Sequence, residues 1–305
     1  MAPENLPSAV GTSVSRVSIW IQAARPKTLW AAVAPVLVGT ALAWRDEEFH
    51  PLAAIGALLG ALALQIAANF ANDLYDYEHG ADTHGRIGPL RVTQAGLVTP
   101  LAMRLALTTA LGFAFLVGVF LVVRAGWPIA VVGLSSIVAS ILYTGGPRPY
   151  GYIGLGEAFV FLFFGVAAVN GTYYVQALTV STAAVVLSFS MGFLAVAILV
   201  VNNLRDIDTD RQAGKKTLAV RLGHRGARIE LVGVFALAAL MPFVVVLLGF
   251  CGPGTLLASL AMAGAIPLLR TVYRTSDGPA MNQVLAQTAR LQLVYAILLA
   301  IGINL

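Results

Sequence analysis

Nine long apolar runs, separated by short polar links, occupy most of this chain of 305 residues. A helix needs about 20 mainly apolar residues to cross the hydrocarbon core of a bilayer, and fewer where its polar ends stay helical. The runs therefore predict an all-α, polytopic membrane protein, a bundle of about nine transmembrane helices. They cover residues 29–44, 52–70, 101–123, 127–142, 153–175, 178–201, 231–250, 255–269 and 284–305.

The polar segments at the two ends of this pattern carry their own predictions. Residues 1–18 are polar and no apolar core follows a basic start at once, so we expect a disordered tail and not a cleaved signal. Residues 16–24, with Trp20, predict a short helix lying in the membrane interface. Residues 19–305 are expected to form a single transmembrane domain. In the last run, Gln287, Arg290 and Gln292 predict a polar face turned toward the bundle.

Composition supports a membrane protein. Hydrophobic residues make up 58% of the chain and charged residues 11%, and the mean hydropathy is +0.83, which excludes an ordinary soluble domain of this length. The single cysteine, Cys251, excludes an intrachain disulfide and a cysteine-based zinc site. The expected surrounding partner is membrane lipid, and no nucleic-acid partner is expected.

The basic residues divide unequally between the two sides of the expected bundle. Nine spans place loops on alternating sides, and seventeen of the nineteen Lys and Arg then fall on the side of the N-terminus, leaving Arg45 and Arg124 on the other. Lys and Arg concentrate in cytoplasmic loops. The N-terminus is therefore expected in the cytoplasm and the C-terminus outside. The cytoplasmic loops lie around residues 71–100, 143–152, 202–228 and 270–283.

Half of the acids in the chain lie in two clusters at expected helix ends. NFANDLYDYEHGAD, residues 69–82, contains four of the fourteen Asp and Glu, and NNLRDIDTD, residues 202–210, contains three. The clusters align at an offset of 130 residues, with four predicted helices between them. An even number of helices puts both on one membrane face, so they form a parallel pseudo-repeat. Carboxylates are costly in a membrane protein, so this placement predicts a functional site.

Polar side chains in each cluster recur at steps of three or four residues, which places them along one face of a helix. The stripes are Gln65, Asn69, Asn72, Asp73 and Asp76, and Asn202, Asp206 and Asp210. Such a stripe must face a cavity or a neighbouring helix, and two facing stripes supply the hard oxygen ligands that Mg²⁺ prefers. The alternative is two polar helix ends capped by Asp and Asn. The expected metal ligands are Asn72, Asp73, Asp76, Asn202, Asp206 and Asp210.

Basic side chains adjoin both clusters in the polar loops. Carboxylates that hold a metal, with cations that hold the remaining oxygens, suit a metal-bound diphosphate. The alternative is purely topological, because cytoplasmic loops are basic in any case. The expected diphosphate-binding residues are Arg86, Arg91, Arg148, Lys215 and Lys216.

A diphosphate held beside an apolar cavity fits one reaction directly. An allylic prenyl diphosphate ionises when cations take up charge on its leaving group. The resulting carbocation must be shielded from water and can be stabilised by aromatic faces. Tyr143, Tyr150 and Tyr152 lie in a loop expected to cover the site, and their alternative role is in the interfacial aromatic belt. The residues thus favour Mg²⁺-dependent prenyl transfer.

The two motifs resemble the signatures of the UbiA superfamily of intramembrane aromatic prenyltransferases: NDLYD after the second run, and NNLRDIDTDRQAGKKTLAVRLG after the sixth. The resemblance extends from about Arg25 to the C-terminus. One departure lies at Gly80, where many members carry a third acid; the next acid here is Asp82, a shift that is usual in the menaquinone branch. Further segments resemble that branch: RPKTL at 25–29, HGRIGPLR at 84–91, YTGGPRPYGYIGLGE at 143–157 and MNQVLAQTA at 281–289.

This resemblance implies a central cavity, closed by cytoplasmic cap loops and open laterally to lipid. It also implies a bacterial plasma membrane, Mg²⁺ as cofactor, a polyprenyl or phytyl diphosphate as donor and 1,4-dihydroxy-2-naphthoate as acceptor, with decarboxylation to demethylmenaquinone in menaquinone biosynthesis. The implied catalytic residues are Asp73, Asp76, Asp206, Asp210 and Tyr143. The implied substrate-binding residues are Arg25, Lys27, Gln65, Asn69 and Tyr150.

Two alternative functions stay open. Within the superfamily, the acceptor can be 4-hydroxybenzoate or homogentisate. A secondary transporter belongs to another class, and its charges should lie near the bilayer midplane on broken helices. The acids here lie at expected helix ends, which favours an enzyme.

Overall fold

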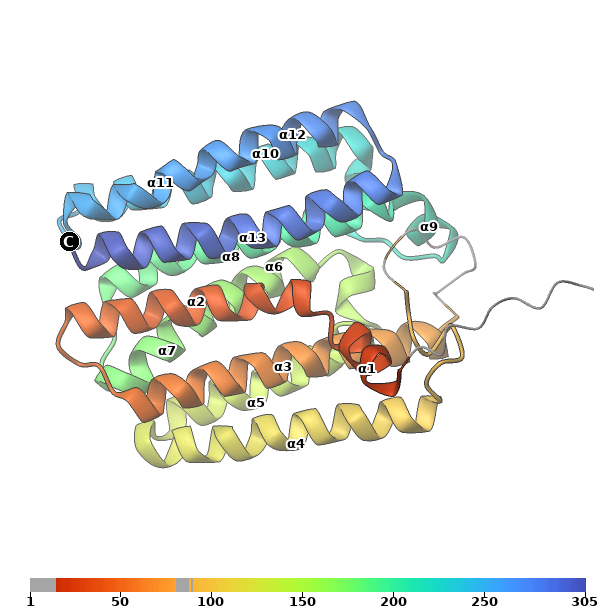
Figure 1. The fold of residues 1–305 in the computed structure, drawn as a ribbon, viewed down its shortest axis with the longest axis horizontal. Coiled ribbons are helices and arrows are strands. Elements are labelled where there is room, and N and C mark those ends of the chain that lie inside the picture. The colour runs from red at the N-terminus through yellow and green to blue at the C-terminus, as the bar shows by residue number, and fades with distance from the viewer. Residues whose placement is uncertain (1–14, 81–87, 89) are drawn as a thin grey trace, which may run out of the picture.

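The computed structural model describes residues 15–80, 88 and 90–305, and all regular elements within these ranges are helices (Figure 1). Eight segments are long and apolar enough to cross a membrane, and α5 is a shorter apolar helix beside them. Together they match the nine predicted runs, so the all-α membrane bundle is confirmed. They are α2 (Pro26–Arg45), α3 (Pro51–Glu78), α4 (Pro100–Ala125), α5 (Trp127–Leu142), the segment Gly156–Ala177, α8 (Thr182–Arg205), α10 (Leu218–Leu247), the segment Pro253–Arg274 and α13 (Gly278–Ile303).

Two of these segments change helix type along their length. Segment Gly156–Ala177 contains a π-helix, a conformation that is often found beside functional sites. Its parts are α6 (Gly156–Val160), η2 (Phe161–Ala167) and α7 (Ala168–Ala177). The parts of segment Pro253–Arg274 are η3 (Pro253–Leu256), α11 (Leu257–Ala261), η4 (Met262–Gly264) and α12 (Ala265–Arg274).

Local sequence decides where the helices begin. Proline lies in the first turn of α2, α3, α4, α5 and α13, where its missing N–H removes no helical hydrogen bond. Short polar side chains cap several N-termini, including those of α4 and α13, by accepting the backbone N–H three residues on. These caps are Ser15, Thr99, Ser181, Thr217 and Asp277.

The short helix predicted at residues 16–24 is confirmed as α1 (Arg16–Ala24). A prediction about another polar segment needs adjustment. The predicted loop 202–228 is largely helical, as the end of α8, α9 (Ile207–Gln212) and the first turns of α10, which bend at Gly223 with φ 69°. The reason is that these turns are amphipathic, and the apolar run that marks the helix begins only at residue 231.

The polar face expected on α13 is only partly turned inward. Gln292 is fully buried and donates from Nε2 to the carbonyl oxygen of Met191 at 3.3 Å. Gln287 and Arg290 are exposed, so the prediction was wrong for these two residues. A step of five residues along a helix moves a side chain well around its axis, so Gln287 and Gln292 lie on different faces.

Glycines allow the central helices to approach closely. A Cβ added to Gly165 of η2 would lie 2.5 Å from the Cα of Gly192 on α8. A Cβ added to Gly39 of α2 would lie 2.6 Å from the carbonyl oxygen of Val169 on α7. Small residues at such crossings let membrane helices pack backbone to backbone. Segment Gly156–Ala177 is therefore held tightly against both α8 and α2.

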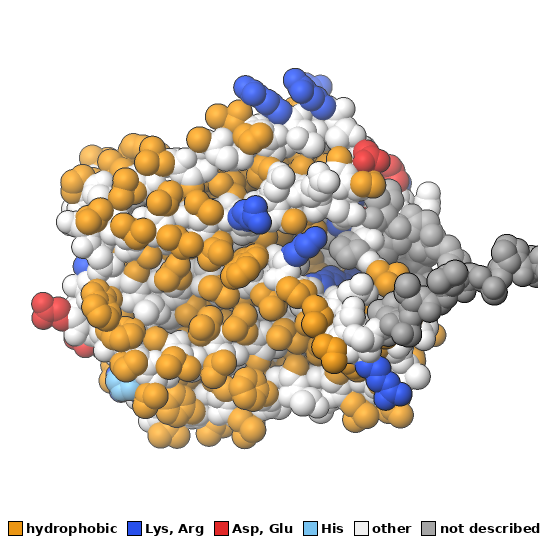
Figure 2. Space-filling view, in the orientation of Figure 1, with side chains coloured by type: hydrophobic (Ala, Val, Ile, Leu, Met, Phe, Trp, Pro, Cys, Tyr) orange, Lys and Arg blue, Asp and Glu red, His pale blue; other side chains and the backbone are white. Residues whose placement is uncertain are grey.

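The two ends of the bundle differ. α1 and α9 lie at one end, and the C-terminus lies at the opposite end (Figure 1). Apolar side chains cover most of the face in Figure 2, and the Lys and Arg side chains visible there lie mainly on the half that carries α1 and α9. A polar end above an apolar wall is the arrangement expected of a membrane-embedded bundle.

Candidate active site

A cavity of about 610 Å³ extends along the interior of the bundle. Most of its wall consists of Ala, Val, Leu, Ile, Gly and Phe side chains from α2 to α8. The wall becomes polar and charged where the two acidic motifs meet, near α1 and α9, and we call this end of the cavity its mouth. The polar lining there is Arg25, Thr28, Gln65, Asn72, Asp76, Arg91, Tyr143, Thr144, Tyr150, Tyr152, Asn202, Asn203, Asp206, Thr209, Asp210, Lys215 and Thr217.

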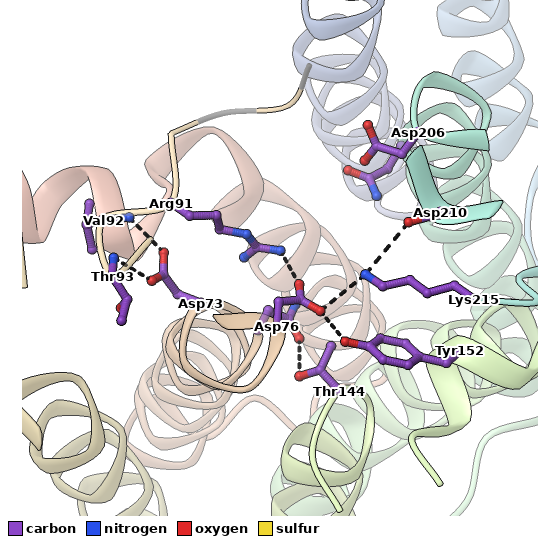
Figure 3. A network of polar contacts seen from close by, with 12 residues as sticks. Asp73, Asp76, Arg91, Val92, Thr93, Thr144, Tyr152, Asp206, Asp210 and Lys215 are labelled. Atoms are coloured by element: carbon purple, nitrogen blue, oxygen red, sulfur yellow. Dashed lines mark hydrogen bonds and ion pairs between the residues drawn. The ribbon is translucent and has the colours of Figure 1, made fainter. Parts of the chain in front are cut away.

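Asp76, at the end of α3, is the centre of the polar contacts at this mouth (Figure 3). Its Oδ2 lies 2.6 Å from Nη2 of Arg91, and its Oδ1 lies 3.2 Å from Nζ of Lys215. The phenol of Tyr152 also donates to Oδ1, and the ammonium of Lys215 lies 4.5 Å from the centroid of the Tyr152 ring. One buried carboxylate thus joins the first motif to the loop before α10.

Asp73 is turned away from the cavity, although it belongs to the same motif. Its two oxygens accept the backbone N–H groups of Val92 and Thr93 at 3.1 and 2.9 Å, and the residue is only 1% exposed (Figure 3). These bonds fix the loop that carries Arg91. In this geometry Asp73 holds the loop and does not line the predicted metal site, because both its oxygens are engaged elsewhere.

The second motif is organised by Arg205, a residue that the sequence interpretation did not single out. Its side chain is 1% exposed, and the guanidinium binds Asp206 through two N–H groups, from Nε at 2.8 Å and Nη2 at 2.6 Å. It also donates to Oδ1 of Asn202 at 2.9 Å and to Oδ1 of Asn282 on α13 at 2.7 Å. The signal was present in the sequence as an arginine inside the NNLRD motif itself.

The two adjacent lysines after the second motif point in different directions. The backbone N–H of Lys215 donates to the carbonyl oxygen of Asp210 at 2.9 Å, across Gly214 with φ 75°, and its Nζ lies 3.7 Å from Oδ1 of Asp210. This turn brings Lys215 into the cavity. Lys216 is exposed, and its backbone N–H donates to the carbonyl oxygen of Tyr152 at 2.7 Å. Lys216 therefore fixes the loop through its backbone.

Amide side chains complete the polar wall. Asn72 accepts from the hydroxyl of Thr144 at 3.0 Å. Asn69 donates from Nδ2 to the carbonyl oxygen of Ala24 and to Thr28, and so joins α3 to the junction of α1 and α2 without lining the cavity. Oε1 of Gln65 is buried and has no hydrogen-bond partner among the residues that the structure describes.

Several predicted site residues do not line the cavity. Lys27 and Arg148 are exposed and do not line the cavity, like Lys216. Arg86, and Asp82 with it, lie outside the described residues. The predicted residues that do line the cavity are Arg25, Gln65, Asn72, Asp76, Arg91, Tyr143, Tyr150, Asn202, Asp206, Asp210 and Lys215.

Aromatic rings form the wall directly below the charged mouth. The rings of Tyr143 and Tyr150 pack edge to face, with 5.3 Å between their centroids. The ring of Tyr150 stacks on that of Phe159, with 4.1 Å between the centroids. Burial raises the pKa of both phenols, for Tyr143 with a further contribution from the negative charge of Glu157. The two tyrosines therefore stay neutral at physiological pH and present ring faces and hydroxyl groups to the cavity.

The donor set at the mouth fits a hard divalent cation. Carboxylates and side-chain amides are the oxygen ligands that Mg²⁺ takes, usually together with phosphate oxygens. Within the described part of the chain, no group of three His, Cys, Asp or Glu side chains stands in metal-binding geometry. The carboxylates are instead paired with the cations Arg91, Arg205 and Lys215. The arrangement thus suits a metal that arrives with an anion able to take over those cations.

The fold and the site define an integral membrane protein with an amphiphilic cavity, which has ion pairs at its mouth and an apolar interior. The chain belongs to the UbiA prenyltransferase family, whose model matches residues 32–294.

Curated relatives and solved structures agree with this assignment. The 1,4-dihydroxy-2-naphthoate octaprenyltransferase of Escherichia coli (strain K12) is 40% identical over 96% of this chain and 97% of its own length. The protein of the same name from Mycobacterium tuberculosis (strain ATCC 25618 / H37Rv) is 42% identical over 92% of this chain and 95% of its own. The structure of a UbiA homolog from Archaeoglobus fulgidus bound to GPP and Mg²⁺ has the same fold, with a TM-score of 0.68 at 16% identity over 92% of this chain and 99% of that one.

Proposed function

We propose that this protein transfers a polyprenyl group from its diphosphate to 1,4-dihydroxy-2-naphthoate. The prenyl carbon forms a bond to the aromatic ring, diphosphate leaves, and the ring carboxylate is lost as CO₂. The product is demethylmenaquinol, the reduced form of demethylmenaquinone, in menaquinone biosynthesis. The observation that carries the proposal is a cavity that joins a charged mouth to an apolar, aromatic-lined interior. The acceptor is supported by the relatives of that name, which match nearly the whole chain.

The oxygen ligands that line the mouth are the residues that would hold Mg²⁺. The metal supplies positive charge that stabilises the departing diphosphate. Asp73 is not included, because its oxygens hold the backbone of Val92 and Thr93. The proposed ligands are Asn72, Asp76, Asn202, Asp206 and Asp210.

Arg91 and Lys215 bind the diphosphate oxygens in this proposal. Both already point into the mouth, where they neutralise Asp76. When a diphosphate is present, their N–H groups can exchange the carboxylate for phosphate oxygens of higher charge. Their stabilisation grows as the bond to the prenyl carbon breaks, so they favour the transition state over the ground state.

The wall below the mouth protects the reacting carbon. Tyr143 and Tyr150 are neutral and present aromatic faces, which stabilise a developing cation. The apolar wall excludes water, which would otherwise capture the carbocation. Arg25, at the junction of α1 and α2, and Gln65, on α3, both line this mouth. We assign Arg25 to the acceptor carboxylate and the unpartnered Oε1 of Gln65 to a ring hydroxyl.

The proposed orientation puts the mouth in the cytoplasm of a bacterial cell, at the plasma membrane. The N-terminus and the loops around the mouth then face the cytoplasm, and the C-terminus faces outside. Two observations support this: the seventeen-to-two division of basic residues, and the opposite positions of α1 and the C-terminus in the bundle (Figure 1).

A product analysis tests the proposed reaction. The purified protein in lipid nanodiscs receives Mg²⁺, octaprenyl diphosphate and one acceptor at a time, and products are identified by mass spectrometry. We expect octaprenyl demethylmenaquinol from 1,4-dihydroxy-2-naphthoate. Faster prenylation of 4-hydroxybenzoate or homogentisate would contradict the acceptor. Absence of diphosphate release with all three acceptors would contradict the enzyme and favour a transporter.

A further inference from the structure

A second cavity, of about 640 Å³, lies between α5 and segment Gly156–Ala177. Its wall comes from the first half of α5, from η2 and α7, and from the link to α8. It is near the end of the bundle opposite α1 and α9, where α7 lies (Figure 1). The two cavities share part of their wall, so they adjoin each other. The shared residues are Ile129, Val132, Phe163, Ala167 and Gly171.

The packing of the neighbouring helices explains this space. Gly165 lies backbone to backbone against Gly192 of α8, and Val169 lies against Gly39 of α2. These close contacts hold segment Gly156–Ala177 on two sides. On its third side, toward α5, no such contact exists among the described residues: a Cβ on Gly171 would meet only Cγ1 of Val132, at 3.9 Å. The gap is therefore a property of the packing and not of one side chain.

The second cavity suits an apolar occupant. Most of its wall is aliphatic or aromatic, and its serines bond within the protein. Ser135 donates to the carbonyl oxygen of Val132 at 3.0 Å, and Ser181 caps α8. Asn170 donates its amide to the carbonyl oxygen of Val166 at 2.8 Å, while its buried Oδ1 has no hydrogen-bond partner among the residues that the structure describes. No Lys, Arg, Asp or Glu lines this cavity in the described part of the chain, so a charged ligand has no counter-ion there.

From these observations we infer that the second cavity receives the distal end of the polyprenyl chain, with Gly171 as the residue that keeps the passage open. The inference rests on the proposed function, because the proximal end of the same chain is bound at the mouth. A volume of about 610 Å³ is in the range of pockets that hold one small ligand, about 300–1,000 Å³. An aromatic acceptor and the first prenyl units occupy a space of this size, and a long chain needs the second cavity.

A different exit has to be distinguished. Val123 of α4 and Leu134 of α5 line the main cavity and are 83% and 55% exposed, so this cavity also reaches the surface between α4 and α5. Gly133 lies on α5 and lines only the main cavity, and a Cβ there would meet nothing within 4 Å. Gly171 and Gly133 therefore test the two routes with the same substitution.

The experiment compares a long with a short donor. The reconstituted enzyme carrying Gly171→Leu, Gly133→Leu or Gly112→Leu receives 1,4-dihydroxy-2-naphthoate with either octaprenyl or geranyl diphosphate. We expect Gly171→Leu to lower the octaprenyl-to-geranyl ratio of kcat/KM about tenfold or more, because added methylenes block the distal chain. Gly112 lies exposed on α4 outside both cavities, so the octaprenyl-to-geranyl ratio of kcat/KM for Gly112→Leu should match that of the wild type.

The outcomes separate the passage from the reaction itself. A lowered ratio in Gly133→Leu with an unchanged ratio in Gly171→Leu would overturn the inference in favour of the α4–α5 route. Loss of product with both donors in the wild type would instead contradict the proposed function. If Gly171→Leu does not fold, Val132→Phe narrows the passage from α5. A donor with a photoreactive group on its last prenyl unit should label α7 and residues 178–181, and labelling of α4 alone would also overturn the inference.

Discussion

Two carboxylates three residues apart have different surroundings in this protein. Asp76 faces the cavity, while Asp73 binds the backbone at Val92 and Thr93. A step of three residues on a helix separates side chains by about 60°. This rotation is enough to place one carboxylate at the mouth and the other behind it, under the loop that carries Arg91.

A matched pair of substitutions tests these two roles. We expect Asp76→Asn to lower kcat on the order of 10²-fold or more, because the proposed Mg²⁺ site loses a carboxylate ligand that stabilises the departing diphosphate. Asp73→Asn keeps one acceptor for the loop, so it should cost about 1 kcal/mol of loop docking and should mainly raise KM for the donor. Steady-state kinetics with the polyprenyl diphosphate measures both. Equal loss of kcat in the two variants would show that Asp73 also acts at the mouth.

The two adjacent lysines provide a second comparison. Lys215→Ala removes a cation that lies 3.2 Å from Asp76, and we expect kcat to fall on the order of 10²-fold. Lys216→Ala removes only an exposed side chain and leaves the backbone N–H to Tyr152 intact, so its rate should stay near wild type. Arg228→Ala, whose guanidinium faces Tyr273, is the control for a basic residue away from the cavity. Similar small effects at all three positions would mean that these charges serve topology alone.

At the scale of elements, the hydrophobic pattern predicted the helices well, because a helix that crosses the membrane must carry mainly apolar side chains along its whole length. The motif spacing also predicted that Asp76, Asp206 and Asp210 share one cavity. What the pattern could not give was the orientation of side chains in the cap loops. The different directions of Lys215 and Lys216 depend on the turn at Gly214, and the position of Asp73 depends on residues far along the chain. Such contacts have no periodic signature.

The close crossing of η2 and α8 should be destabilised by a small increase in side-chain size. Gly165→Val places a Cβ about 2.5 Å from the Cα of Gly192, so the two backbones must separate. Overpacking of this kind costs about 1–3 kcal/mol. We expect a lower melting temperature for the purified protein in detergent. Gly112→Val, on an open face of α4, is the control, and an equal loss of stability there would show that the effect is general to glycine in these helices.

At the scale of the whole molecule, the separation of charged and apolar surfaces predicts the orientation in the membrane. Reporters fused after Asp46 or Pro253 should report the outside, and one inserted near Gly278 should report the cytoplasm, because the basic side of a membrane protein stays in the cytoplasm. A pair of fusions to alkaline phosphatase and green fluorescent protein at each site measures this. A cytoplasmic signal at Pro253 would show that the C-terminal helices cross the membrane in the direction opposite to the predicted one.

The ion pairs at the mouth have a consequence for how the enzyme becomes saturated. Each carboxylate already has an internal counter-ion, such as Lys215 for Asp76 and Arg205 for Asp206. A divalent cation that binds alone must displace Lys215 and Arg205 from the carboxylates. A diphosphate that binds alone must displace the carboxylates from those basic side chains. Bound together, they exchange counter-ions without leaving a buried charge unpaired.

Binding of metal and donor should therefore be strongly linked, and reciprocity requires each to raise the affinity of the other by the same factor. Calorimetry with Mg²⁺ and a non-hydrolysable prenyl diphosphate analogue, separately and together, should give a factor of about 5–150. Affinities that are independent of each other would contradict the exchange. Such linkage makes the liganded fraction of the enzyme depend on the product of the Mg²⁺ and donor concentrations, so that either ligand alone binds weakly.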